Sequence, residues 1–235
     1  MKILVLIPAF NEAACIAGVI ADIRRVVPDY DILVVNDGSS DETAPIAKAS
    51  GATVISHPFN MRYGVTIQTG YKYAFANGYD YIVQIDADGQ HDPGCIPELL
   101  KPVLAGETDF ALGSRFLGGG SYKPGWARAM GMAFFRVLVS WRTGMRITDS
   151  TSGYQAFNRN VIRFFTSDAF PNDYPDADVL ITLHLAGFRV SEVPVCMFSS
   201  SGATMHSGLR PLYYMFKMLL SIFVTLLRGE QPDRR

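Results

Sequence analysis

The sequence predicts an α/β fold built on a mostly parallel central sheet with helices on both of its faces. Short apolar runs alternate with longer stretches of helical periodicity, which is the pattern of repeated strand–helix–strand units. The chain has 235 residues, of which 49% are hydrophobic, enough to bury the core of one such domain. We therefore expect one main domain and no clean division into two.

The first half of the chain contains the clearest elements. Apolar runs predict strands at residues 3–7, 31–35, 52–55, 81–85 and 109–112. Helical periodicity predicts helices near residues 12–27, 41–50, 64–77 and 94–104. Right-handed crossovers between such strands give a parallel sheet that is covered on both faces.

In the second half the regular alternation of strands and helices ends, at a glycine-rich loop, Gly118–Gly120. Beyond this loop we expect helices near 126–143, 159–166 and 176–186 and a strand near 188–193. The expected organisation is a main domain over residues 1–200, with halves 1–113 and 114–200, followed by a C-terminal segment over 201–235.

Charge and cysteine content exclude several classes of protein. The net charge is −1, and the absence of a long basic run argues against a nucleic-acid partner. Cys15, Cys95 and Cys196 are odd in number and far apart, as expected of reduced thiols that serve as small core residues. The first apolar run ends at Pro8 and is too short for a signal peptide, so we expect a cytoplasmic protein.

Polar side chains follow three of the predicted strands. Asn11 and Glu12 follow the first strand, Asp37 follows the second, and Asp86 and Asp88 follow the fourth. The carboxyl ends of parallel strands meet at one edge of a sheet, so these groups are expected to converge there. Helix capping is the alternative for each turn by itself, at residues 11–12 and again at 40–43.

Two carboxylates one residue apart, Asp86 and Asp88, suit a divalent cation that carries a nucleotide diphosphate. Mg²⁺ and Mn²⁺ prefer oxygen ligands and take few protein groups, which leaves positions for phosphate and water. A solvated turn is the alternative for this pair. The adjacent His91 is either a further ligand or a solvated turn residue.

Four motifs together resemble those of family 2 glycosyltransferases, which have the GT-A fold. They are PAFNE at 8–12, VNDGSSD at 35–41, DADGQ at 86–90 and TDSTSGYQ at 148–155. Within that family the chain is most similar to dolichol-phosphate mannose synthases and polyprenyl-phosphate sugar transferases. The resemblance runs from Lys2 to about Val195.

The resemblance implies a donor site for a nucleoside diphosphate sugar. Asp88 and Gln90 would ligate Mg²⁺ or Mn²⁺ directly, and Asp86 would face both the ribose and the metal. The residues implied to hold the nucleotide base and ribose are Pro8, Ala9, Asn11, Glu12 and Asp37.

The resemblance also implies an acceptor site in the second half. Arg115 and Arg128 occupy places where family members bind a lipid phosphate, which suits the two parallel hydrogen bonds of a guanidinium group. Surface arginines paired with nearby acids are the alternative. Asp149 stands near the reacting centre, where it would act as general base or position the acceptor, and capping of the turn before Gly153 is its alternative.

The chain departs from the family pattern in two loops. Ser199 and Met205 stand where polyprenyl-phosphate transferases often carry basic residues. His206 or Arg210 would then take over the contact with the diphosphate, or the loop serves another acceptor. Arg62 stands where glycine is often found and would either reach the donor phosphates or lie exposed.

The segment from Leu209 to Arg228 predicts an apolar helix with one narrow polar stripe, formed by Lys217, Ser221, Thr225 and Arg228. It is barely long enough to span a bilayer and has a lysine near its middle, so we expect it to lie in the membrane interface. Burial against a second copy of the chain or a membrane-protein partner is the alternative.

These observations predict a metal-dependent, inverting glycosyltransferase that is peripheral on the cytoplasmic face of the membrane. The preferred acceptor is polyprenyl phosphate, whose phosphate is already anionic and needs no base. The alternative acceptor is a hydroxyl group of a polysaccharide or glycolipid, with Asp149 as the base. A catalytically silent sugar-nucleotide-binding subunit is less favoured, because the acidic motif and Asp149 are both intact.

Overall fold

The computed structural model describes residues 1–117, 133, 136–137, 139–145, 147–167, 170–171 and 177–198. Several residues singled out above lie outside this part of the chain, namely Arg128, Ser199, Met205, His206 and Arg210. The C-terminal segment over 201–235 also lies outside it. The proposals for these residues therefore remain predictions.

The described residues form one seven-stranded sheet with the order β3-β2-β1-β4-β6-β5-β7. The strands are β1 (Ile3–Ala9), β2 (Asp31–Asn36), β3 (Thr53–Ser56), β4 (Tyr81–Gln84), β5 (Phe110–Ser114), β6 (Gln155–Asn158) and β7 (Val190–Pro194). Pairings β1–β2, β1–β4, β2–β3 and β5–β7 are parallel, and β6 is antiparallel to both of its neighbours. The predicted mostly parallel sheet is confirmed.

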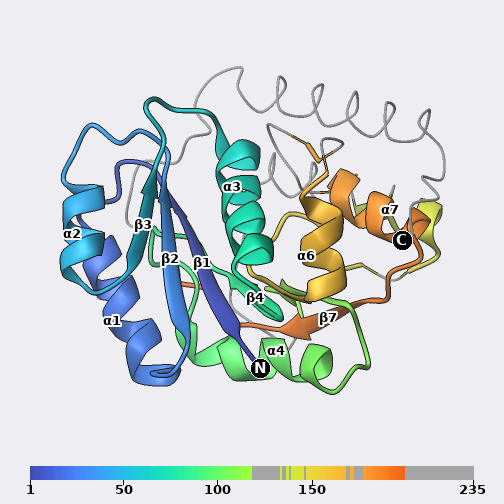
Figure 1. Cartoon of the computed structure of the whole chain (residues 1–235). Helices are drawn as coiled ribbons and strands as arrows, with labels where there is room; N and C mark the ends of the chain where they lie inside the picture. The colour runs from blue at the N-terminus through green and yellow to red at the C-terminus, as the bar shows by residue number, and fades with distance from the viewer. Residues whose placement is uncertain are drawn as a thin grey trace.

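Helices cover both faces of this sheet, as predicted (Figure 1). One core contains residues of α1 (Ile16–Val26), α2 (Thr43–Ala49) and α4 (Ile96–Leu104), which follows the short 3₁₀ turn η1 (Pro93–Cys95). The other core contains residues of α3 (Tyr63–Ala76), α6 (Arg159–Phe165) and α7 (Ala177–Leu185).

Strand β1 shows how the sequence produces these two layers. Ile3, Val5 and Ile7 belong to the core on the α1 side, whereas Leu4 and Leu6 belong to the core on the α3 side. All five side chains are buried. Because both faces of the strand are covered, its sequence is continuously apolar and not alternating.

Two elements differ from the prediction. Strand β6 was not predicted, because its four residues, Gln155–Asn158, mix polar and apolar types and continue directly into α6. The helix expected from residue 12 begins only at Ile16, because Asn11 adopts a left-handed backbone with φ of 56° and residues 12–15 form a turn.

The direction of β6 determines which loops meet at the carboxyl edge of the sheet. Strands β4 and β5 are both antiparallel to β6, so they run in the same direction as each other. The carboxyl ends of β1, β2, β4 and β5 therefore open on one edge, and the loop that enters β6, residues 148–154, reaches that same edge. All the motifs within the described residues meet there.

Candidate active site

The loops after β1 and β2 are joined by side-chain to backbone hydrogen bonds. The amide of Asn11 donates to Ser39 Oγ at 2.9 Å, and the amide of Ser40 donates to Asn11 Oδ1 at 2.9 Å. The amide of Glu12 donates to Thr43 Oγ1 at 2.8 Å. No side chain caps α1, so the capping interpretation of Asn11 and Glu12 is wrong. These residues instead hold the two loops together.

Asp37 is buried behind this pair of loops and anchors the loop after β3. Its Oδ1 lies 2.8 Å from His57 Nδ1 and accepts a hydrogen bond from the Met61 amide at 2.8 Å. Its Oδ2 accepts one from the Arg62 amide at 3.0 Å. His57 was missed by sequence reasoning, because a single histidine after a short strand carries no pattern.

Pro8 and Ala9 are the last two residues of β1, and both are buried. The Ala9 carbonyl accepts a hydrogen bond from the Asp37 amide at 2.8 Å. The exposed Phe10 follows them at the edge of the sheet. The first motif therefore leads directly from a buried strand into the edge where the other loops meet.

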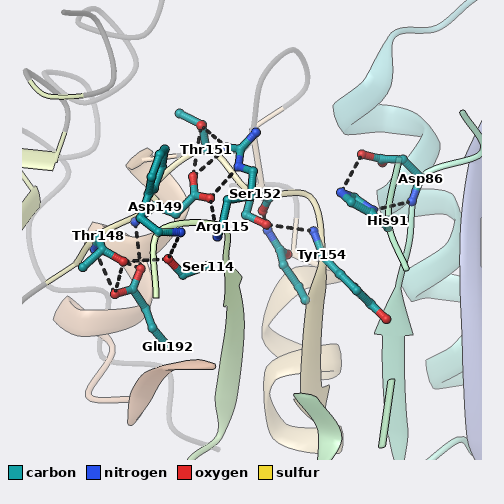
Figure 2. Close-up of polar contacts among 12 residues, drawn as sticks. Asp86, His91, Ser114, Arg115, Thr148, Asp149, Thr151, Ser152, Tyr154 and Glu192 are labelled. Carbon is teal, nitrogen blue, oxygen red and sulfur yellow. Dashed lines mark hydrogen bonds and ion pairs between the residues drawn. The ribbon is translucent and has the colours of Figure 1, made fainter. Parts of the chain in front are cut away.

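Asp86 lies at the centre of the edge, two residues after the end of β4. Its Oδ1 accepts a hydrogen bond from the Tyr63 hydroxyl at 3.0 Å. Its amide donates to His91 Nδ1 at 3.1 Å, so the proton of a neutral His91 lies on Nε2, 3.7 Å from Asp86 Oδ2. Figure 2 shows this pair beside the ring of Tyr154.

His91 is therefore not the solvated turn residue considered from the sequence. It is 6% exposed and its ring stacks on that of Tyr154, with the centroids 4.9 Å apart. Burial lowers its pKa and outweighs the opposing effect of the Asp86 carboxylate. The neutral ring can hold the acidic turn in place by hydrogen bonding and stacking.

Gly153 brings the loop before β6 into contact with Asp86. A Cβ atom at this position would lie 2.8 Å from Asp86 Oδ2 and 3.0 Å from the Tyr63 hydroxyl. The Gly153 carbonyl accepts a hydrogen bond from the Gln84 side chain at 3.1 Å. Position 153 therefore requires glycine, because the backbone there lies too close to the Asp86 carboxylate to leave room for a side chain.

Asp88 and Gln90 lie side by side in the same turn. The Gln90 amide donates to Asp88 Oδ1 at 2.9 Å, and the Gln90 side-chain amide contacts Asp88 Oδ2. Burial, followed by the negative charges of Asp88, Asp41 and Asp86, raises the pKa of Glu12. This edge is thus acidic and rich in oxygen atoms, which are the ligands of Mg²⁺ and Mn²⁺.

Arg115 and Asp149, predicted separately, are each other's partners (Figure 2). Arg115 Nε donates to Asp149 Oδ2 at 2.6 Å and a terminal nitrogen donates to Oδ1 at 2.7 Å. The Asp149 side chain is fully buried and that of Arg115 is 14% exposed. Both oxygens of Asp149 therefore accept a hydrogen bond from the Arg115 guanidinium group.

Glu192 of β7 holds the backbone around Asp149 in place by hydrogen bonds. Its carboxylate accepts hydrogen bonds from the amides of Thr148 and Asp149, each at 2.8 Å, and from the Thr148 hydroxyl at 2.9 Å. The Thr148 and Ser114 hydroxyls are 2.6 Å apart. Glu192 was missed by sequence reasoning, although a single acid within the run VSEVPV was a usable signal.

A cavity of about 520 Å³ lies beside this support. Thr148, which is hydrogen-bonded to Glu192, also lines this cavity. Two other lining residues, Trp141 and Val137, are 79% and 63% exposed. The lining residues are Arg136, Val137, Ser140, Trp141, Ile147 and Thr148. The cavity combines apolar side chains with one arginine.

This mostly parallel α/β sheet, with an acidic turn and an arginine–carboxylate pair at its carboxyl edge, has the GT-A-type fold of glycosyltransferases. Residues 4–166 match Glycosyl transferase family 2, and the chain belongs to this family. It is accordingly an enzyme of the hexosyltransferase class.

Individual relatives agree with this assignment. The chain is 30% identical over 210 residues to undecaprenyl-phosphate mannosyltransferase of Micrococcus luteus, covering 83% of each protein. It is 29% identical over 227 residues to polyprenol monophosphomannose synthase of Mycolicibacterium smegmatis, covering 92% of this chain and 85% of that protein.

Among solved structures, one similar fold is glucosyl-3-phosphoglycerate synthase from Mycobacterium tuberculosis in complex with Mn²⁺, uridine diphosphate and glucosyl-3-phosphoglycerate. The TM-score is 0.69 at 25% identity, and the match covers 99% of this chain and 81% of that one. Another structure of the same enzyme contains Mg²⁺ and uridine diphosphate. Within the described residues, no helix is both long and apolar enough to cross a membrane.

Proposed function

We propose that this protein is a metal-dependent, inverting glycosyltransferase that moves a hexose from a nucleoside diphosphate sugar to polyprenyl phosphate at the cytoplasmic face of the membrane. The observation that carries the proposal is the contact through Gly153, which joins the acidic turn of Asp86 to the loop that holds the Arg115–Asp149 pair. A cation-binding donor side and an anion-binding acceptor side are thus adjacent.

The donor side fits a hard divalent cation. Asp86, Asp88 and Gln90 would hold Mg²⁺ or Mn²⁺ through oxygen atoms, once the Gln90 side chain turns its oxygen toward the ion. When bound, such a cation neutralises the charge that develops on a diphosphate leaving group. The paired loops at Asn11 and Glu12, with Asp37 behind them, would hold the base and ribose.

The acceptor side fits a phosphate better than a neutral hydroxyl group. A sugar hydroxyl needs a base to attack, whereas a lipid phosphate is already anionic. Both oxygens of Asp149 are bonded to Arg115, which supports a role for Asp149 in positioning Arg115 toward an anion. The names of the similar proteins, undecaprenyl-phosphate mannosyltransferase and polyprenol monophosphomannose synthase, support the same acceptor.

The cavity beside Thr148 suits the first isoprene units of such an acceptor, because Val137, Trp141 and Ile147 give it apolar walls. In this proposal Arg128 and His206 provide further anion contacts, and the helix predicted over Leu209–Arg228 lies on the membrane. The domain division at residue 200, with a donor half over 1–113, belongs to the same proposal.

A second candidate acceptor is a hydroxyl group. The fold is similar to glucosyl-3-phosphoglycerate synthase, whose structure holds glucosyl-3-phosphoglycerate, and this similarity favours a phosphorylated hydroxyl compound. In that case Asp149 would act as the base.

Radiolabelled transfer with purified protein tests the proposal. The protein is incubated with Mn²⁺ and UDP-, GDP- or dTDP-sugars, with undecaprenyl phosphate or with phosphoglycerate. We expect one donor to give label in the organic phase only when the lipid phosphate is present. Label that enters phosphoglycerate alone would support the hydroxyl acceptor, and no transfer from any donor would contradict the proposed activity.

The Asp88→Ala variant is expected to lose the transfer in this assay. Its matched control is Asp22→Ala, which removes an exposed carboxylate of α1 that pairs only at the surface with Arg25. This control should retain the wild-type rate.

A further inference from the structure

Two of the three cysteines lie together outside the proposed donor site. Cys95 ends the turn η1, and Cys196 follows the end of β7. Together with Asp92 they form a group whose ligand atoms all lie within 4.8 Å of one another. Cys95 is partly buried and packs against the core on the α1 side, as predicted, whereas Cys196 is exposed, so the prediction of a core residue is wrong for Cys196.

The backbone holds this group in place. The Cys196 amide donates to Cys95 Sγ at 3.3 Å, so this sulfur is a hydrogen-bond acceptor. The Asp92 amide donates to the Cys196 carbonyl at 3.3 Å, and the Cys95 amide donates to the Asp92 carbonyl at 3.1 Å. The Tyr154 hydroxyl donates to the same Asp92 carbonyl at 3.0 Å.

We propose that Cys95, Cys196 and Asp92 form a second metal site, specific for a thiophilic divalent cation such as Zn²⁺. Thiolates and a carboxylate are a ligand set that zinc accepts, and their spacing lets one ion contact all three after small side-chain movements. Three protein ligands leave the fourth tetrahedral position to water, whereas a structural zinc site has four protein ligands.

Ligand hardness separates this site from the donor site. Asp86, Asp88 and Gln90 offer only oxygen atoms, which Mg²⁺ and Mn²⁺ prefer, whereas two sulfur ligands select zinc over both.

Occupancy of this site would fasten the chain after β7 to the acidic turn. Directly after Cys196, Met197 pairs with His91 as an isolated antiparallel bridge, and the Phe198 amide donates to the Gln90 carbonyl at 2.7 Å. Zinc would therefore stiffen the turn that carries Gln90 without contacting the donor-site ligands.

Metal titration of the full chain tests this inference and does not depend on its enzymatic activity. The chelator-treated, reduced protein is dialysed against Zn²⁺ in a large excess of Mg²⁺, and bound zinc is counted. Cd²⁺ is added in parallel, because its thiolate complexes absorb in the ultraviolet. We expect one equivalent of either ion, with the cadmium absorption band present.

Single cysteine variants locate the bound ion. Cys95→Ser and Cys196→Ser should each lose the bound equivalent and the cadmium band. Cys15→Ser should keep both and is the matched control, because Cys15 precedes α1 and is not part of the group. Retention of the bound zinc in Cys95→Ser and Cys196→Ser, or no binding by the wild-type protein, would overturn the inference.

Amide hydrogen exchange provides a second readout on the folded protein. Zinc should slow exchange at the Asp92, Cys196 and Phe198 amides by several-fold in the wild type and leave it unchanged in Cys95→Ser. Asp88→Ala should still show the slowing, which separates this site from the donor cation site. Slowing that disappears in Asp88→Ala but persists in Cys95→Ser would place the ion at the donor site and contradict the inference.

Discussion

Gly153 is the residue at which the proposed donor and acceptor sides of the site meet. Replacing it with alanine would place a Cβ atom 2.8 Å from Asp86 Oδ2, so that the carboxylate or the loop must move. Such strain costs about 1–2 kcal/mol, which predicts a roughly tenfold higher Mn²⁺ concentration for half-maximal transfer in Gly153→Ala.

The control for this variant is Gly18→Ala, since a Cβ on Gly18 in α1 meets nothing within 4 Å. Its Mn²⁺ dependence should match that of the wild type. Equal Mn²⁺ dependence in Gly153→Ala and the wild type would show that cation binding does not depend on the present position of the Asp86 carboxylate.

Asp149 predicts a second effect at the residue scale. Asp149→Asn keeps the shape of the side chain but removes the negative charge that pairs with the largely buried Arg115 guanidinium group. We expect a loss of about 3 kcal/mol in the free energy of unfolding together with a lower kcat, measured by urea denaturation and by transfer assays.

Glu192→Gln is the graded comparison for Asp149→Asn. A glutamine side chain has one oxygen in place of two, so it loses part of the bonding to the Thr148 and Asp149 amides and should cost about 1 kcal/mol. Equal effects of the two variants would mean that the ion pair contributes no more than a single supporting hydrogen bond.

At the scale of elements, the loops after β1 and β2 act as one unit, because Thr43 Oγ1 accepts a hydrogen bond from the Glu12 amide at 2.8 Å. Thr43 is fully buried, so Thr43→Val leaves that amide without its acceptor and should cost about 1–2 kcal/mol. We also expect a higher KM for the donor with a nearly unchanged kcat. Thr53→Val, at an exposed position of β3, is the control and should change neither quantity.

The junction of β5 and β7 predicts a pH dependence of stability. Hydrogen bonds from Arg189, the largest cause, lower the pKa of Asp109 below its ordinary value. Because the pKa is lower in the folded state, this stabilisation is present above the unfolded-state pKa and is lost as the pH falls through the folded-state pKa.

Asp109→Asn should therefore cost about 1–2 kcal/mol near neutral pH, and its difference from the wild type should shrink well below the ordinary aspartate pKa of about 3.9. Urea denaturation across this pH range measures the difference. Asp22→Asn, in an exposed pair with Arg25, should show little effect at any pH. A difference between Asp109→Asn and the wild type that persists at low pH would contradict this origin.

The elements also show how much of the structure the sequence can predict. Continuous apolar runs form most of strands β1, β2 and β4, so their positions and the acidic turn after β4 were predictable. Strand β6 was not, because its apolar run is only Ala156 and Phe157 and its pairing depends on distant partners in β4 and β5.

At the scale of the whole molecule, β6 determines which site residues meet. Its antiparallel direction carries residues 148–154 to the carboxyl edge, where Gly153 meets Asp86 and Asp149 meets Arg115. The sequence predicted each of these motifs but not that Arg115 and Asp149 bond to each other, because that contact depends on the path of the chain between them.

The central claim is that the acidic turn binds the cation on which sugar transfer depends. The most direct measurement is the transfer rate of chelator-treated protein as Mn²⁺ is added back, for the wild type and for Asp88→Ala, with Asp22→Ala as the control. We predict no transfer without metal, recovery in the wild type and in Asp22→Ala, and at least about a hundredfold lower rate in Asp88→Ala at the same Mn²⁺ concentration. Full activity in the chelated protein, or equal recovery in Asp88→Ala, would contradict the claim.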